Sequence, residues 1–258
     1  MEKIDKIFTF NSVQEVCKYI ERTPNCEKNR ASDDVSERSF IFSGTKSLDE
    51  ALSLLQNGDN ELLKKILAAP NTPKLNAQRQ KTSGIEIYRS AQGFVPNIGA
   101  VRAGHPVNMY NCRRTFTKSA KILNIIYDIS TPQTTPANEI LKASTKLFNY
   151  IYAKEAEGYR VNLFACCLVY FRTIKQYIMW SVKLKSSDEH FDLLRTAFPL
   201  CHPSFLRRVV FALEERANIQ AYSNGYGNTL STSFAKGLMI KNFPNFDYYN
   251  IETIENAK

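Results

Sequence analysis

The sequence contains no run of eighteen or more apolar residues, which excludes a membrane-spanning helix of ordinary length. Its first residues, MEKIDKIFTF, lack the charged region, apolar region and small-residue cleavage site of a secretory signal. We therefore expect a cytoplasmic protein with no membrane contact. Because 43% of the 258 residues are hydrophobic, the chain has enough apolar material to bury a sizeable core.

Metal-binding and disulfide patterns are also missing. None of the six cysteines lies in a C-x-x-C spacing, and Cys166 and Cys167 are neighbours inside an apolar run. A buried thiol in such a run behaves as a small hydrophobic group. The cysteines are therefore predicted to be reduced and structural.

Recognisable catalytic motifs are absent as well. The sequence has no G-x-S-x-G, no H-E-x-x-H and no complete phosphate loop, because GTKS at residues 44–47 lacks the upstream glycine. His105 and His202 each precede a proline, which favours a structural role in an extended loop. These absences predict a non-enzymatic protein, although an enzyme with dispersed residues stays open.

Acidic residues are scarce in one part of the chain. Segment 62–127 contains a single acid, Glu86, against eleven basic residues, whereas the remainder is almost neutral. The whole basic excess of the protein therefore lies in this segment. The eleven residues are Lys64, Lys65, Lys74, Arg79, Lys81, Arg89, Arg102, Arg113, Arg114, Lys118 and Lys121.

The first half of the chain predicts short mixed elements. KIFTF reads as a strand, and Ser12 or Asn11 begins a helix with apolar residues at helical spacing. RSFIFSGTK is a candidate strand that ends at Gly44. Ser47 and Glu50 form a capping box for a helix that ends at Gly58, and NELLKKILAA predicts another helix. From there to about residue 117 we expect mostly loops, with a short helix or turn within 99–110.

The second half predicts a clearer architecture. A strand at 121–130, a helix from 135 to 158 and a strand at 159–171 form a βαβ unit with parallel strands. Only RTIKQ separates the last of these from the apolar run at 177–185, so that run is predicted to be an antiparallel edge strand. Helices are predicted within 188–198 and 204–217, and a short strand at 237–243. The predicted fold class is α/β: an irregular α+β region, 1–118, packs on a domain with a mostly parallel sheet, 119–258.

This order of elements resembles the von Willebrand factor A fold. In that family a D-x-S-x-S run after the first strand, a later threonine and a further aspartate hold Mg²⁺ and leave a position for an acidic group of a partner. Asp128 and Ser130 match the first two positions, Pro132 replaces the second serine, and Ser204 falls near the place of the threonine. No aspartate matches after the last strand, so the resemblance implies a degenerate metal site.

The sequence is also similar to an uncharacterised family encoded by bacteriophages and bacteria. The similarity lies in FSGTKSLDEALSLLQNG, VPNIGAVRAGHPVNM and CHPSFLRRVVFALEE, which come from both halves of the chain. The similarity implies a phage-encoded protein of a bacterial host cell, but it does not indicate an activity. The likeness to the A fold implies protein binding, often alongside ring-forming ATPases of the AAA class.

Two interpretations of the strand end at Asp128 stay open. Asp128, Ser130 and Ser204 could supply three oxygen ligands to a weakly held Mg²⁺. Alternatively, the Asp128 carboxylate caps the turn that follows the strand. In either case the carboxyl ends of parallel strands are where open α/β sheets bind ligands. We predict that Asp128, Thr131 and His202 contact a protein partner there, with no cofactor required.

The basic segment supports an alternative function. Arg113, Arg114, Lys118 and Lys121 lie close in sequence to Tyr110 and Phe116, and Arg102 lies upstream. Basic residues next to aromatic residues are typical of phosphate contacts beside base-stacking surfaces. The alternative is therefore a nucleic-acid-binding protein that uses segment 62–127. A solvated basic loop that contacts an acidic partner explains the same charges.

Overall fold

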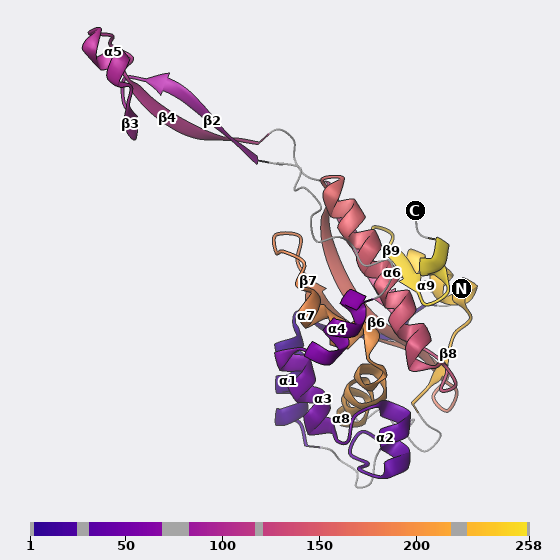
Figure 1. Ribbon diagram of the computed structural model, residues 1–258. Coiled ribbons are helices and arrows are strands. Elements are labelled where there is room, and N and C mark those ends of the chain that lie inside the picture. The colour runs from indigo at the N-terminus through magenta and orange to yellow at the C-terminus, as the bar shows by residue number, and fades with distance from the viewer. Residues whose placement is uncertain (1–2, 25–30, 69–82, 117–120, 218–225, 257–258) are drawn as a thin grey trace.

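The structure of the protein is a computed structural model that describes residues 3–24, 31–68, 83–116, 121–217 and 226–256. A six-stranded sheet with helices on both sides forms the main body, and a three-stranded antiparallel sheet extends away from it (Figure 1). The protein is therefore of the α/β class, with a mostly parallel main sheet and a separate antiparallel sheet.

The main sheet takes strands from both ends of the chain. They lie in the order β1-β7-β6-β5-β9, and β8 pairs with β6 off this path. The pairs β1–β7, β5–β6 and β5–β9 are parallel, whereas β6–β7 and β6–β8 are antiparallel. The strands are β1 (Lys6–Phe10), β5 (Ile122–Asp128), β6 (Arg160–Phe171), β7 (Gln176–Lys185), β8 (Asn228–Thr229) and β9 (Asp247–Asn250).

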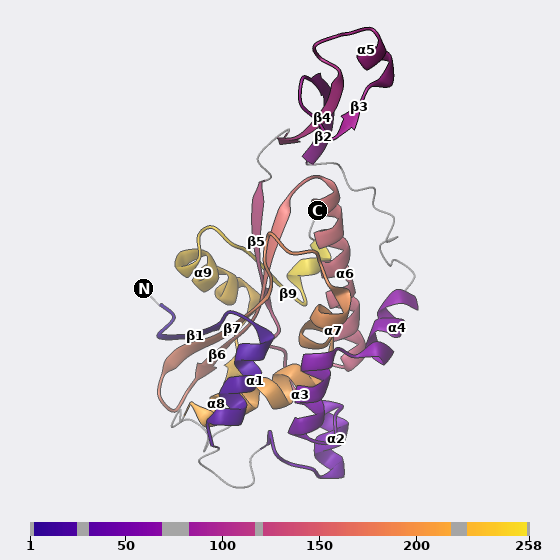
Figure 2. The ribbon, with the colours of Figure 1, turned by 90° about the vertical axis from the view of Figure 1, so that its left-hand side faces the viewer.

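Helices cover the two faces of this sheet unequally. One face carries the larger core, to which α1, α3, α4, α6, α7, η1 and α8 contribute, and the other face is covered by α9 (Figure 2). Successive residues of β5 alternate between the two cores, so Ile125 and Tyr127 face the larger one and Ile126 the smaller one. The helices are α1 (Val13–Arg22), α2 (Glu37–Ser43), α3 (Leu48–Asn57), α4 (Asn60–Ala68), α6 (Ala137–Ala156), α7 (Leu193–Cys201), the π-helix η1 (Phe205–Val210), α8 (Phe211–Arg216), α9 (Thr232–Asn242) and the 3-10 helix η3 (Thr253–Asn256).

The predicted βαβ unit is confirmed. Strands β5 and β6 pair in parallel, with α6 between them in sequence, and β7 follows β6 as an antiparallel hairpin strand. The position of β7 at the edge of the sheet is wrong, however. Strand β1 pairs in parallel with the outer side of β7, so β7 is internal and β1 forms the edge. The hairpin was predictable because the short RTIKQ segment directly connects β6 to β7. The β1–β7 pairing instead joins residues that are far apart in sequence.

The described residues up to residue 68 belong to the main body. Besides β1, helices α1, α3 and α4 place Val16, Leu52 and Ile66 in the larger core. The predicted boundary at residue 118 therefore separates β1 from the sheet to which it is hydrogen-bonded.

Two predicted strands are helices instead. RSFIFS forms α2, because the Ser36 side chain accepts a hydrogen bond from the Ser39 N–H and Gly44 ends the helix with a φ of 84°. GLMIKNF lies in α9, where Ala235, Leu238 and Met239 are buried at helical spacing. The last strand of the sheet is β9, which follows this helix.

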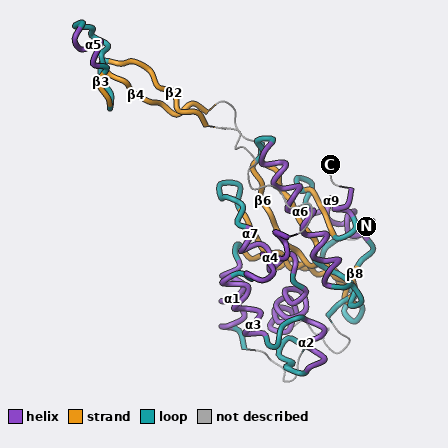
Figure 3. The backbone as a smooth tube through the Cα atoms, in the orientation of Figure 1, coloured by secondary structure: helices purple, strands orange, loops and turns teal. Residues whose placement is uncertain are grey.

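Residues 83–116 form the antiparallel sheet, which we call the arm. We predicted mostly loops here, and that prediction is wrong apart from the short helix. Figure 3 shows the arm as a strand pair with a helical turn at its far end. Its elements are β2 (Ser83–Ser90), β3 (Val95–Pro96), α5 (Ile98–Arg102) and β4 (Met109–Phe116), with β4 in the centre.

Gly93 lies in the short connection between β2 and β3, next to β4. A Cβ atom at this position would lie 2.0 Å from the carbonyl oxygen of Tyr110, so only glycine allows the backbone to approach β4 this closely. The Phe94 N–H donates to that same carbonyl. The glycine thus permits strand pairing instead of interrupting it.

Candidate functional site

Asp128 ends β5 and lies beneath the surface, with only 3% of its area exposed. One of its carboxylate oxygens accepts the backbone N–H of Ser130 at 2.9 Å and the Ser130 hydroxyl at 2.6 Å. The other accepts the Tyr248 hydroxyl at 2.9 Å. Asp128 therefore caps the turn after its strand, which is one of the two interpretations that the sequence left open.

Burial also changes the acidity of this carboxyl. Removal from water raises the pKa of Asp128 to about 6, and the hydrogen bonds from Ser130 and Tyr248 oppose this change. Because the folded pKa lies above the unfolded value of about 3.9, the folded state binds this proton more tightly. The stabilisation is complete below about pH 4 and is lost as pH rises through the folded pKa.

We therefore expect Asp128→Asn to remove part of the pH dependence of stability. The free energy of unfolding of the wild type, minus that of the variant, should fall by about 2 kcal/mol from pH 4 to pH 7. Urea unfolding at four pH values between these limits measures the difference. Asp188→Asn, at an exposed carboxylate, is the control, and a difference that does not vary with pH contradicts the prediction.

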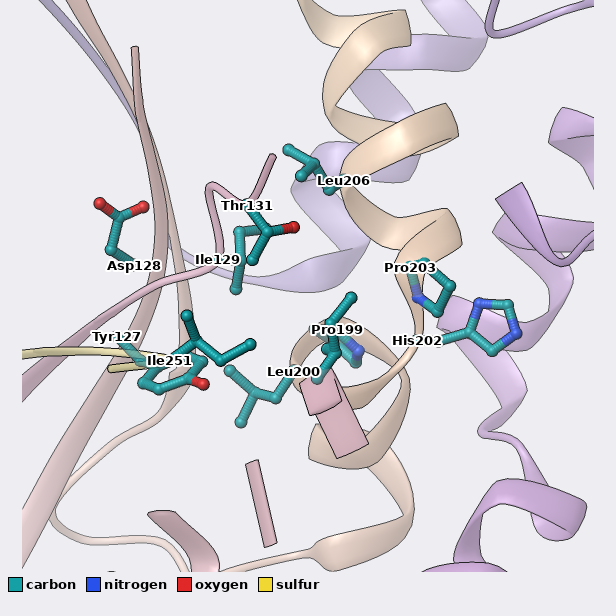
Figure 4. Close-up of a pocket in the computed structure, with 11 residues that line it drawn as sticks. Tyr127, Asp128, Ile129, Thr131, Pro199, Leu200, His202, Pro203, Leu206 and Ile251 are labelled. Carbon is teal, nitrogen blue, oxygen red and sulfur yellow. The ribbon is translucent and has the colours of Figure 1, made fainter. Parts of the chain in front are cut away.

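Ser204 lies apart from this carboxylate. It is fully buried, and its hydroxyl oxygen lies 2.6 Å from that of Thr45, with which it shares a hydrogen bond. Figure 4 shows the Asp128 carboxylate on the opposite side of the sheet from His202 and Pro203, which precede Ser204. The structure thus brings Asp128 and Ser130 together and holds Ser204 elsewhere. Within the described ranges, no group of three or more His, Cys, Asp or Glu side chains could hold a metal ion.

The predicted partner surface is also largely covered. Asp128 and Thr131 are buried, and His202 is half-buried against the ring of Phe198, at a centroid distance of 5.0 Å. Burial lowers the pKa of His202, and its Nδ1 accepts the backbone N–H of Ser204. Two of the three residues of the predicted contact surface are therefore buried, and a contact of these residues with a partner stays a prediction.

A small cavity lies between the loop after β5 and the start of η1 (Figure 4). Its volume of about 20 Å³ gives room for roughly one water molecule. The Thr131 hydroxyl, drawn in Figure 4 on the cavity side of the sheet, has no hydrogen-bond partner among the described residues. The cavity thus has room for one water molecule beside that hydroxyl, and it is too small for a larger ligand.

Two consecutive arginines of η1 were not predicted to be functional, yet they hold this part of the molecule together. Arg208 is fully buried, and its three nitrogens make five hydrogen bonds of 2.8 to 3.3 Å to residues of the α2 region. The acceptors are the carbonyl oxygens of Ser32, Asp34 and Thr45 and the hydroxyl oxygens of Ser39 and Ser43. Arg208 therefore fixes the chain around α2 to η1.

Arg207 joins α2 to the loop after β5. Its guanidinium donates to the carbonyl oxygens of Phe42 at 2.6 Å, Gln133 at 3.3 Å and Thr135 at 3.2 Å. It also lies 4.5 Å from the centre of the Phe42 ring, a cation–π contact. Both arginines belong to a π-helix, and π-helical turns occur frequently at functional sites.

A larger cavity lies beside Arg207. Its volume is about 490 Å³, and it opens between Ser130 to Gln133, the middle of β6, the η1–α8 segment and residues 226–229. It is therefore beyond the carboxyl end of β5, where open α/β sheets bind ligands. The sequence analysis singled out this edge of the sheet and two of the lining residues, Ser130 and Thr131, but not Arg207 or the other lining residues.

The match to a family model covers nearly the whole described structure, from residue 4 to residue 257. The chain belongs to the family described as a domain of unknown function, DUF7192. No curated protein and no solved structure matches it. The model of the DUF7192 family thus spans both the main body and the arm.

The arm carries most of the residues predicted to contact nucleic acid. Arg102 is exposed in α5, and Lys121 is exposed just before β5. Arg113 and Arg114 pair through their backbones with Glu86 and Ile85, and Lys118 lies outside the described residues. The structure therefore places Arg102, Arg113 and Arg114 in the arm, the first in α5 and the other two in β4.

Large apolar side chains are exposed on the same sheet, and the sequence analysis did not single them out. The exposed fractions of Ile87, Phe94 and Ile98 are 63%, 60% and 65%. The full set in the arm is Ile87, Tyr88, Phe94, Val95, Ile98, Val101 and Val107. Several exposed large apolar side chains in one small element of structure are a feature of binding sites. Apolar and polar residues alternate in and around IEIYR. This alternation is the sequence signal that could have indicated a strand with side chains on both faces.

Proposed function

We propose that the protein is a non-enzymatic binding module that docks a protein partner through the arm. The observation that carries this proposal is the set of seven exposed large apolar side chains on residues 83–116. The main body has two well-formed cores. We therefore do not attribute the exposure of the apolar side chains of the arm to a lack of space in the interior. Exposed apolar area of this kind is stabilised when a partner covers it.

The charges of the arm specify the chemistry of that partner. Residues 83–116 contain four arginines and one glutamate, so the arm is basic as well as apolar. Arg89 pairs with Tyr110 across β2 and β4, and Ile87 pairs with Cys112, so basic and apolar side chains alternate along one face. The partner we expect is a protein whose docking surface combines apolar and acidic side chains.

The resemblance to the von Willebrand factor A fold adds an expected class of partner. Proteins of that fold often act alongside ring-forming AAA-type ATPases, and we propose such an ATPase as one protein of this kind. A phage origin, and with it a bacterial host cell, likewise remains part of the proposal. The burial of Asp128 argues against a contact through a metal ion at the end of β5. The arm therefore replaces the end of the sheet as the expected docking surface.

The docking proposal is tested with substitutions on the arm. Tagged full-length protein that carries Phe94→Asp and Ile98→Asp should retain about tenfold less of its partner from native lysate than the wild type. The reason is that both substitutions remove apolar contacts with the partner. Ile41→Asp is the matched control, since Ile41 is 76% exposed on α2, outside the arm. Quantitative mass spectrometry of the retained proteins, after nuclease treatment, measures the ratio.

Two results contradict protein docking through the arm. One is that the arm variant and the Ile41→Asp control retain the same proteins in the same amounts. The other is that nuclease treatment removes everything that the wild type retains. Equal melting temperatures of the three proteins show that the exposed substitutions leave the fold intact.

Nucleic-acid binding is the second candidate, favoured by the exposed Arg89 and Arg102 beside the exposed rings of Tyr88 and Phe94. If it is correct, binding of a labelled single-stranded or double-stranded oligonucleotide should weaken by about tenfold or more between low and moderate salt. It should weaken further in Arg89→Ala and Arg102→Ala. Undetectable or salt-independent binding in fluorescence anisotropy dismisses this candidate.

A further inference from the structure

The cavity of about 490 Å³ beyond the end of β5 has the size of a small-molecule site, for which about 300 to 1,000 Å³ is usual. It is lined by parts of the chain that are distant in sequence, among them Cys167, Arg207 and Tyr226. Neither the arm nor the cap formed by Asp128 makes use of it. Its lining therefore has to be explained separately.

Arg207 gives this cavity a positive charge. Only 7% of the residue is exposed, and an arginine guanidinium stays protonated in proteins. Its hydrogen bonds go to three neutral carbonyl groups, and no described residue places a carboxylate within ion-pair distance of it. A buried charge is costly unless an opposite charge pairs with it. Among the described residues, the lining therefore supplies no anion to this buried guanidinium.

The hydrogen-bond geometry leaves donors for such an anion. Nη1 and Nη2 of Arg207 donate to the three carbonyl groups, and Nε donates to none of the described residues. A guanidinium has five N–H groups, so at least one of them is directed away from these carbonyls. Arg208, the next residue, differs in this respect, because its Nε, Nη1 and Nη2 all donate to described oxygens.

Aromatic rings form another part of the lining. The rings of Phe211 and Tyr226 stack with their centres 3.8 Å apart and an interplanar angle of 7°. Phe42 lies against the Arg207 guanidinium, and Val169 and Leu206 add aliphatic surface. A ligand that fills this space therefore needs an apolar, preferably planar, body in addition to a charged group.

We propose that this cavity binds a small organic anion, with its anionic oxygen group at Arg207 and its apolar body against Phe42, Phe211 and Tyr226. A carboxylate and a phosphate monoester share the required chemistry, since arginine pairs with both. This inference goes beyond the docking function and does not depend on the arm. It assigns a ligand site to the edge of the sheet, where a protein contact had been predicted.

Benzoate and phenyl phosphate are the probes for this site, and benzyl alcohol is the neutral control of similar shape. With full-length protein in isothermal titration calorimetry, at least one of the two anions should bind with a dissociation constant of about 1 mM or tighter. Benzyl alcohol should bind at least about tenfold more weakly, because it lacks the charge that pairs with Arg207. The anion that binds more tightly identifies the preferred group.

Three variants locate the binding. Arg207→Met should weaken the bound anion by about tenfold or more, because it removes the charge and keeps a side chain of similar length. Thr229→Trp, at an exposed residue of the cavity rim, should do the same by filling the space, and it decides the test if Arg207→Met does not fold. Arg172→Met, at an exposed arginine of the β6–β7 turn, should bind like the wild type.

Three results overturn the proposal. One is that neither anion binds the wild type at about 10 mM. Another is equal affinity for the anions and for benzyl alcohol. The last is unchanged binding of the anion in Thr229→Trp. This result overturns the proposal if Arg207→Met also binds the anion unchanged, or if Arg207→Met does not fold. The double variant Phe94→Asp and Ile98→Asp should bind the anion as the wild type does, so failure of the docking function leaves this test unaffected.

Discussion

Replacing Arg208 with alanine is expected to lower the free energy of unfolding by about 4 kcal/mol or more, which is enough to unfold a domain of ordinary stability. The reason lies in the five hydrogen bonds that this fully buried side chain makes to the α2 region. Without the guanidinium, three carbonyl groups and two hydroxyl groups lose a donor inside the protein. Each such buried group costs about 1 to 3 kcal/mol when it is left unsatisfied.

Lysine should rescue little of this loss. Its ammonium group keeps the charge, but it donates from one nitrogen at the end of a flexible chain, whereas the guanidinium donates from three nitrogens in a fixed plane. We expect Arg208→Lys to be destabilised by about 2 kcal/mol or more relative to the wild type. Arg172→Ala, at an exposed arginine, should change stability by less than about 0.5 kcal/mol.

Chemical unfolding followed by circular dichroism and Trp180 fluorescence measures these differences. Trp180 is buried in β7, in the main body, so its emission reports loss of the main sheet. If Arg208→Ala unfolds at the same denaturant concentration as Arg172→Ala, then the hydrogen bonds of Arg208 do not stabilise the α2 region. Soluble expression that is lost only in the two Arg208 variants agrees with the prediction.

Replacing Glu214 with glutamine should stabilise the protein, and by more as pH rises. Glu214 in α8 is 0% exposed, and neither carboxylate oxygen has a hydrogen-bond partner among the described residues. Burial, with a further contribution from the charge of Glu215, raises the pKa of Glu214 well above its ordinary value. The folded state therefore holds this carboxyl in its neutral form.

The sign of the pH dependence follows from the raised pKa. The folded state binds the Glu214 proton above the unfolded pKa of about 4.3, where the unfolded state has released it. Stability is thus lost at up to about 1.4 kcal/mol per pH unit as pH rises from there to the folded pKa. Glutamine has no proton to release, so the stability of Glu214→Gln minus that of the wild type should grow over this window.

Melting temperatures between pH 5 and pH 8 test this prediction. The gain of Glu214→Gln should be smallest at pH 5 and largest at pH 8, and Glu21→Gln, at an exposed carboxylate of α1, should show no such trend. A gain that is the same at all pH values indicates a packing effect instead. A loss of stability at pH 8 shows that the Glu214 carboxylate is satisfied by a group outside the described residues.

The elements that the sequence predicted correctly are those specified by nearby residues. Ser47 accepts the Glu50 N–H and begins α3, and Gly58 ends that helix, because capping involves residues only a few positions apart. The apolar runs of β5 and β6, with a helical pattern between them, likewise indicate a βαβ unit from local periodicity. Helix α9 was mistaken for a strand because its apolar residues are nearly continuous in sequence.

Elements that depend on distant pairing were not predictable in the same way. Strand β1 carries no local mark of a parallel partner in β7, and the arm depends on the pairing of Ser83–Ser90 with Met109–Phe116 across its short helix. Glycine and proline in that segment suggested loops, although Gly93 and Pro96 lie at or beside a strand pairing. Tertiary contacts decided the structure there against local propensity.

For the site, the sequence located the region but not its chemistry. Asp128 and Ser130 do interact, because an aspartate two residues before a serine at a strand end readily forms a capped turn. Arg207 and Arg208 lie in the helix predicted within 204–217, and the sequence analysis gave them no role, because charged side chains of a helix usually face water. The sequence signal that could have revealed them is the pair of adjacent arginines inside the apolar run FLRRVVFAL. When apolar residues surround the whole helix, at least one of two adjacent arginines must be buried.

The pairing of β1 with β7 also determines the order in which the chain can fold. Lys6 lies opposite Ile178, so the outer edge of the sheet cannot close until more than two thirds of the chain has left the ribosome. Until then β1 lacks its partner strand, and the apolar stripes of α1 and α3 lack the later elements β7, α7, η1 and α8 on which they pack. Exposed apolar surface of this kind is the condition under which nascent chains aggregate or recruit chaperones. The β2–β4 pairs of the arm are closer in sequence and form without that delay. The surface proposed for docking can therefore be complete while the main body is still being synthesised.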